Sequence, residues 1–246
     1  MPAPRVRDPK TAYKLVQARR RAFNRDVAAL AKRLHVGDLT ITQWHQEMRQ
    51  NIKDLHVSSL VISRGGEWDT ITQAEWGRVG RYLRDQYGYL NTFAEQLRAK
   101  AELAAMNLDT FQNEKYIAAR SALYGGNANA TFWRGVTYGL LPQVPGDGQT
   151  ICRTNCGCHL EVEAGDTPDT LHVFWRINVA LENCEDCVRL AAEWNPYVVA
   201  LPAELMTAGA SLGLDVQRTV MRAIRVDAGW FAGLLHITVH EHREVA

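Results

Sequence analysis

The sequence predicts an α+β protein with a mostly α-helical N-terminal region, a small Cys-rich β/loop module and a short mixed C-terminal segment. Apolar residues recur at three- and four-residue steps through the first part of the chain, which is typical of amphipathic helices. Short segments farther along alternate between apolar and polar residues, as strands do. All five cysteines fall between Cys152 and Cys187. We therefore expect a helical arm or bundle over residues 1–139, the Cys-rich module over 140–200, and a C-terminal segment of unassigned role over 201–246.

Three apolar stripes predict the first three helices. Gly37-Asp38 interrupts the pattern after the first stripe, and Gly65-Gly66 ends the second, because glycine is a poor helix former. The stripes consist of Tyr13, Val16, Phe23, Val27, Leu30 and Leu34; of Ile41, Trp44, Met48, Ile52 and Leu55; and of Trp76, Val79, Leu83, Leu90, Phe93 and Leu97.

Two capping boxes predict where the second and third helices begin. In Thr40-Ile-Thr-Gln43, the threonine caps free N–H groups and the glutamine reaches back to the cap. Thr72-Gln-Ala-Glu75 repeats the arrangement. A fourth helical stretch is expected over residues 109–124, and a further one over 128–137 after Gly125-Gly126.

At Gly139 the sequence becomes rich in turn residues, which favours a boundary there. The turn Pro145-Gly-Asp-Gly148 would lead the chain sharply into the Cys segment. Two strands are expected over residues 159–163 and 171–175, and a short helix or turn over 184–194.

Near the C-terminus, residues 235–242 also have a strand-like pattern. His236, His240 and His242 would share one face of that strand. No carboxylate lies at a sequence spacing from them that is typical of a metal site, so we expect a polar strand face there and not a metal site.

Composition excludes several classes of protein. The chain of 246 residues is 46% hydrophobic and 22% charged, which is typical of a folded protein and not of a disordered one. Lys and Arg number 28 against 27 Asp and Glu, which argues against a uniformly basic nucleic-acid coat protein. No apolar run is long enough to predict a membrane span, and the first ten residues lack the pattern of a secretory signal.

Charge is unevenly distributed despite this balance. Residues 1–35 contain ten basic and two acidic residues, whereas residues 159–200 contain eight acidic residues and two arginines. Arg19, Arg20 and Arg21 stand together in the basic part and are candidates for contact with nucleic acid or with an acidic partner protein. A solvated helix face is the simpler alternative.

The cysteine spacing predicts a zinc site. Two close groups of thiols, Cys152-x3-Cys156-x-Cys158-His159 and Cys184-x2-Cys187, are separated by a connector of the length found in tetrahedral zinc sites. Thiolates are soft ligands that favour zinc over magnesium or calcium. We expect Cys152, Cys156, Cys184 and Cys187 as ligands, with Cys158 or His159 as the substitute for one of them. Five thiols without a metal are the alternative.

Two other functions are compatible with the same residues. His159-Leu-Glu161 followed by Cys184-x2-Cys187 matches the H-x-E…C-x-x-C pattern of zinc deaminases, in which His and two Cys hold the metal and Glu moves protons. That reading leaves Cys152 and Cys156 without a role. The second alternative function is that of a zinc-containing nucleic-acid-binding protein, but few basic residues lie near the cysteines. A four-thiolate site is normally closed and structural, so we expect no enzymatic activity.

The Cys segment also resembles a known group of proteins. Asn155-Cys156-Gly-Cys158, the pair Cys184-Glu-Asp-Cys187 and the stretch Trp76-Gly-Arg-Val-Gly80 are similar to elements of tailed-phage minor head proteins of the Mu F-like head-morphogenesis group. In the better-known members the Cys-x-x-Cys pair comes first, whereas here it comes second.

The resemblance covers roughly residues 12–196 and implies a function in the virion. It implies a non-catalytic structural component that acts in head assembly near the portal and is assembled in the host cytoplasm. It implies contacts with the portal protein, the major capsid protein or both, an oligomer within the virion, and possible contact with packaged DNA.

Overall fold

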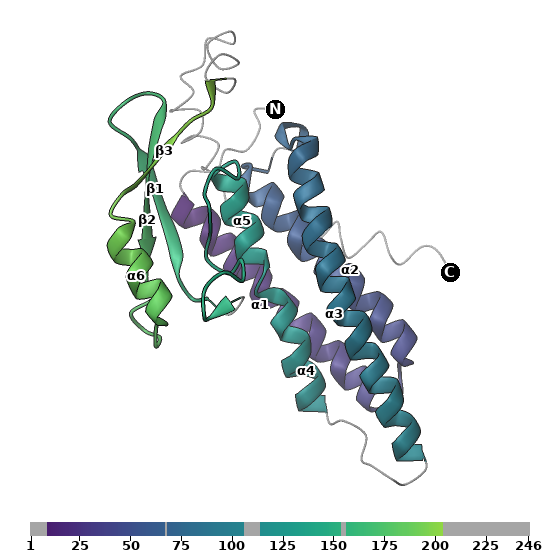
Figure 1. Ribbon diagram of the computed structural model, residues 1–246. Coiled ribbons are helices and arrows are strands. Elements are labelled where there is room, and N and C mark those ends of the chain that lie inside the picture. The colour runs from purple at the N-terminus through teal and green to yellow at the C-terminus, as the bar shows by residue number, and fades with distance from the viewer. Residues whose placement is uncertain (1–8, 67, 106–113, 154–155, 204–246) are drawn as a thin grey trace.

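Helices dominate the first 136 residues of the computed structural model, which describes residues 9–66, 68–105, 114–153 and 156–203. The α+β class is confirmed. Helix α1 packs against α2 and α4, and α2 packs against α3 and α5 (Figure 1). The helical elements are α1 (Pro9–His35), α2 (Ile41–Ser63), η1 (Trp68–Thr70), α3 (Gln73–Ala105), α4 (Glu114–Ala122), η2 (Leu123–Gly125) and α5 (Ala128–Val136).

Most residues of the three predicted stripes face one another in a common core, whereas Val16 and Val79 belong to two other buried clusters. Trp44 of α2 meets Phe93 of α3 edge to face, with ring centroids 5.4 Å apart. Phe23 and Val27 of α1 belong to the same buried cluster. The stripes therefore cover each other, and helices α1 to α4 form a bundle in which the apolar faces are removed from water. The expected helix over 109–124 is described from Glu114, and residues 106–113 lie outside the described ranges.

Both capping boxes are present. The Gln43 N–H donates to Thr40 Oγ1 at 3.2 Å, and the Thr40 N–H donates to Gln43 Oε1 at 2.9 Å. The Thr72 N–H donates to Glu75 Oε2 at 2.9 Å in the same way. Helix α2 ends where Gly65 and Gly66 take positive φ angles of 73° and 87°, a conformation that glycine adopts at little cost.

Glu75 has a second role that the exposed Gln43 lacks. Its other carboxylate oxygen accepts a hydrogen bond from the guanidinium of Arg64, and both side chains are buried. Arg64 also lies over the ring of Tyr138, 3.7 Å from its centroid. The pair joins the end of α2 to the start of α3 and to the turn that follows α5.

A three-stranded antiparallel sheet follows the helices, with β2 in the centre. Buried Leu160 and Val162 of the first strand stand opposite buried Trp175 and Val173 of the second, which confirms the predicted alternation. The third strand was not predicted. The strands are β1 (His159–Ala164), β2 (Thr170–Arg176) and β3 (Tyr197–Ala200), and the helix α6 (Glu185–Glu193) packs against β2.

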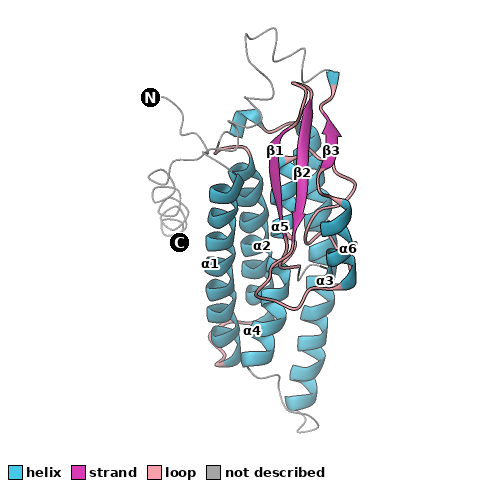
Figure 2. Cartoon of the chain, turned by 90° about the vertical axis from the view of Figure 1, so that its left-hand side faces the viewer, coloured by secondary structure: helices cyan, strands magenta, loops and turns pink. Residues whose placement is uncertain are grey.

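The sheet and α6 lie together on one side of the helices (Figures 1 and 2). Tyr13 of α1 packs on Trp133 of α5 with ring centroids 5.0 Å apart. Val16 and Trp133 share one buried cluster with Leu160 and Trp175 of the sheet. A hydrophobic core therefore extends across residue 139, where the boundary is predicted.

The strand-like stretch 235–242, with its three histidines, lies outside the described ranges, as does nearly all of the segment 201–246. Within the described ranges, no helix has both the length and the apolar character needed to cross a bilayer.

The Arg64–Glu75 pair gives a first prediction. Glu75→Gln keeps a capping side chain but leaves the Arg64 charge buried without a counter-charge, so we expect a loss of about 3–5 kcal/mol in the free energy of unfolding. Urea denaturation measures it. The reverse exchange Gln43→Glu, at the exposed capping position of α2, should change stability by no more than about 0.5 kcal/mol. Equal effects at the two positions would show that the ion pair contributes nothing.

Buried His56 gives a second prediction. Its Nδ1 is hydrogen-bonded to Thr131 Oγ1 at 2.7 Å, and burial lowers its pKa from 6.5 to about 4. Between these pH values the unfolded chain binds more protons than the folded protein, so stability falls as pH falls from 6.5 to 4.

His56→Gln should remove about 3 kcal/mol of this pH dependence, which denaturation at several pH values measures. His45→Gln, the same change at a partly exposed position of α2, is the matched control. An unchanged pH profile in the His56 variant would mean that this imidazole does not stay neutral in the folded state.

Candidate metal centre

Three of the four predicted ligands come together in one group. The Sγ atoms of Cys152, Cys156 and Cys187 all lie within 4.8 Å of one another, and Cys187 is 3.6 Å from each of the other two. These separations are too long for a disulfide, which needs about 2.05 Å. They are close to the distance of about 3.8 Å between sulfurs of a tetrahedral zinc site, which follows from Zn–S bonds of about 2.3 Å. The trio therefore has the donor type and the spacing of a metal site.

Local structure places these thiols. Cys152 lies in a tight turn in which the Arg153 N–H donates to the Thr150 carbonyl at 2.8 Å, with Arg153 at a φ of 49°. Cys187 lies in the first turn of α6, and Cys184 is the N-cap residue of that helix. The spacing Cys-x2-Cys therefore puts both thiols at the same end of α6, where the helix dipole favours negative charge.

A carboxylate holds the two Cys-bearing segments together. Asp186 Oδ2 accepts a hydrogen bond from the Ile151 N–H at 2.9 Å. This bond joins the turn that carries Cys152 directly to the helix that carries Cys187. No local pattern marks Asp186 for this role, because its partner lies 35 residues away.

The two remaining thiols flank the trio. Cys158 is buried, and its Sγ lies 3.8 Å from Asn183 Oδ1. Cys184 is partly buried and interacts with Cys187 and Cys152. Each is adjacent to the three-thiol group, and either one would complete a set of four ligands.

The thiols of the cluster differ in the direction of their pKa shifts. The pKa of Cys156 is raised because its thiol donates a hydrogen bond to Cys158 and because burial disfavours its thiolate. Burial and the nearby Cys158 also raise the pKa of Cys187. The hydrogen bond from Cys156 lowers the pKa of Cys158, against the effect of burial. A cation bound among these thiols would replace their protons.

His159 and Glu161, the residues of the deaminase pattern, do not belong to the three-thiol group. The His159 ring lies against Tyr13, with centroids 6.0 Å apart. Glu161 accepts a hydrogen bond from Arg176 Nε at 2.7 Å on a partly exposed strand face. Among the described residues, the group with ligand atoms in mutual reach consists of thiols alone.

The three consecutive arginines of α1 have three different surroundings. Arg19 lies 3.9 Å from Asp26, Arg20 lines a pocket beside the cysteines, and Arg21 is exposed. They do not form one cationic cluster, because consecutive residues of a helix point in different directions.

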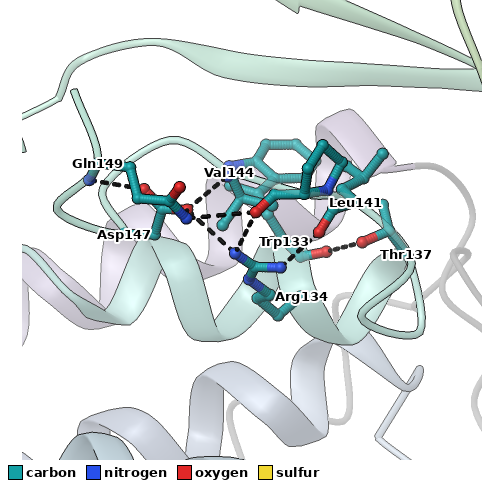
Figure 3. A network of polar contacts seen from close by, with 8 residues as sticks. Trp133, Arg134, Thr137, Leu141, Val144, Asp147 and Gln149 are labelled. Atoms are coloured by element: carbon teal, nitrogen blue, oxygen red, sulfur yellow. Dashed lines mark hydrogen bonds and ion pairs between the residues drawn. The ribbon is translucent and has the colours of Figure 1, made fainter.

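The turn before the cysteines is held by a polar network (Figure 3). Asp147 accepts hydrogen bonds from the Val144 N–H at 2.8 Å and the Gln149 N–H at 3.1 Å, and it pairs with Arg134 at 3.1 Å. Arg134 also donates to the carbonyl oxygens of Leu141 and Pro142. The predicted turn 145–148 is thereby tied to α5, which fixes the point from which the Cys segment begins.

The link through Asp186 gives a third prediction. Asp186→Ala should weaken metal binding by about tenfold or more while leaving every thiol in place, because partners that orient ligands contribute that much to affinity. Competition with a chromophoric chelator measures the affinity. Glu185→Ala is the matched control, since it removes one exposed carboxylate from the same helical turn. Equal losses in the two variants would point to charge alone and not to the hydrogen bond.

Three thiols at ligand spacing therefore form the candidate metal centre. The hydrogen bond from Ile151 to Asp186 joins the segments that carry Cys152 and Cys187. Cys158 and Cys184 are the candidates for a fourth ligand. Comparisons of the chain with protein-family models, with curated proteins and with solved structures found no match.

Proposed function

We propose that this protein is a structural minor head protein of a tailed phage, in which a zinc ion bound by four thiolates fixes the Cys-rich module on the helical bundle. The observation that carries the proposal is the group of Cys152, Cys156 and Cys187. It joins the turn before the hairpin of β1 and β2 to the helix after it, so that a metal there would close the module.

Zinc is the metal that these ligands favour. Sulfur ligands select zinc over hard cations, and a tetrahedral arrangement suits its filled d shell. Cys184 is the proposed fourth ligand because it shares the first turn of α6 with Cys187, and Cys158 is the alternative. The bound zinc would supply charge neutralisation for the thiolates and stability for a module with a small core.

A structural role suits this donor set. Four thiolates leave no position for substrate or water, whereas catalytic zinc sites keep one open. His159 packs on Tyr13, and Glu161 pairs with Arg176, so both already have structural partners.

The assignment to phage heads rests on the resemblance around Cys156, Cys158, Cys184 and Cys187. Exposed aromatic residues are compatible with it, because a head protein needs surfaces for neighbouring subunits. Trp68 is 51% exposed and stacks on Trp76 with centroids 5.5 Å apart. The proposed partners are the portal protein and the major capsid protein, and the proposed location is the virion.

Metal analysis of the purified protein tests the zinc centre. We expect one zinc per chain, and we expect Cys152→Ser, Cys156→Ser and Cys187→Ser to lose it. Cys184→Ser and Cys158→Ser form the matched pair that identifies the fourth ligand, since only one of them should lose the metal. Cobalt substitution provides a spectroscopic count of the thiolates. Retention of zinc by the Cys187 variant would rule out this site.

Co-expression with the portal and major capsid proteins encoded in the same genome tests the head function. The intact chain should remain in purified heads, and Cys187→Ser should be absent from them. Failure of a zinc-loaded chain to enter heads would remove the head assignment and leave the metal centre standing.

A further inference from the structure

A pocket of about 530 Å³ lies between α1 and the Cys-rich module. One wall is a single face of α1, with Tyr13, Gln17 and Arg20 at helical spacing. The opposite wall includes Val179 and Leu181 of the connector between β2 and α6. The volume is in the range of pockets that bind ligands, roughly 300–1,000 Å³.

The connector wall has a defined conformation. The Asn183 side-chain amide donates to the carbonyl oxygens of Asn178 and Leu181, both at 2.9 Å. Leu181 packs so closely on Gly157 that a Cβ at that glycine would lie 2.5 Å from Leu181 Cδ1. Asn183 is also the neighbour of Cys158, so the wall is continuous with the cysteine cluster.

The two walls differ in chemistry. Arg20 provides a permanent positive charge, and Tyr13 and Gln17 add polar groups beside it. None of the described residues that line the pocket is Asp or Glu. Within the described part of the chain, no carboxylate lies at ion-pair distance from Arg20. The connector side is aliphatic and open, with Val179 91% exposed.

We propose that this pocket binds a segment of a partner protein in which an acidic side chain is flanked by apolar side chains. The carboxylate would pair with Arg20, whose planar guanidinium suits bidentate binding of carboxylates. The neighbouring apolar side chains would cover Val179 and Leu181. This inference stands on the pocket alone and does not require the head-protein assignment.

A nucleic-acid backbone fits the pocket less well. Binding of a phosphate backbone requires several cations along a groove, and Arg20 is the only Arg or Lys among the lining residues that the structure describes. The two rings that line the pocket, Tyr13 and His159, lie against each other with centroids 6.0 Å apart, and the connector wall is aliphatic, so the pocket lacks the succession of aromatic platforms found in single-strand binders. A peptide satisfies both walls at once.

Two blocked peptides of sequence Gly-Leu-Glu-Leu-Gly and Gly-Leu-Gln-Leu-Gly test the proposal by NMR titration of the purified full chain. The acidic peptide should shift the amide signals of Gly157, Val179 and Leu181, with a dissociation constant at or below about 1 mM. The Gln peptide should bind about tenfold or more weakly, as expected for loss of a charge-assisted hydrogen bond.

Matched variants separate the two walls. Arg20→Met should abolish the shifts, whereas Arg21→Met, which removes the same charge from an exposed neighbour, should keep them. Val179→Asp should abolish binding through repulsion, whereas Val188→Asp, on the exposed side of α6, should not. Dispersion of the amide signals shows that each variant is folded.

Three outcomes would overturn the proposal. Equal binding of the two peptides would show that the pocket does not select for charge. Equivalent shifts with inorganic phosphate or a duplex oligonucleotide would make the pocket a general anion or DNA site. An absence of shifts at pocket residues with the acidic peptide at several millimolar would show that it binds no such segment.

Discussion

The sulfur of Cys187 is the point on which the Cys-rich module depends. It lies 3.6 Å from the sulfurs of both Cys152 and Cys156, which precede it by 35 and 31 residues. Between these cysteines lie the hairpin of β1 and β2 and the connector to α6. The sheet is small, with a third strand of four residues, and contacts that close this loop add to the stability that the core shared with the helices provides.

Repulsion between ionised thiols makes the closing of this loop sensitive to a bound cation. Several thiols in a buried cluster cannot all ionise, because each thiolate raises the pKa of its neighbours. This is the situation at Cys156 and Cys187, whose pKa values are raised beside Cys158. A divalent cation removes the repulsion and lets the thiolates approach at ligand distance. Folding of the module and metal binding would therefore be one coupled process in the proposed zinc protein.

The module is also packed onto the helices. Phe132 and Trp133 of α5 meet edge to face at 4.7 Å, and Tyr13 of α1 lies between them and His159 of β1. Tyr13 and His159 of this aromatic contact also line the pocket beside Arg20, together with Cys156 of the cysteine cluster.

The sequence by itself determined the features that depend on near neighbours. The stripes through Trp44 and Phe93, the capping boxes at Thr40 and Thr72 and the alternation around Leu160 follow from helical and strand periodicity, which is local. The thiol spacing likewise indicated three members of the cluster.

Only the tertiary structure decided which distant residues meet. No local signal predicted β3, the bond from Ile151 to Asp186, or the buried partner of Glu75. Arg20 and Val179 share a pocket although they are 159 positions apart in the sequence, because α1 and the module pack through Tyr13 and His159. Such contacts depend on how whole faces pack, and local spacing does not encode that.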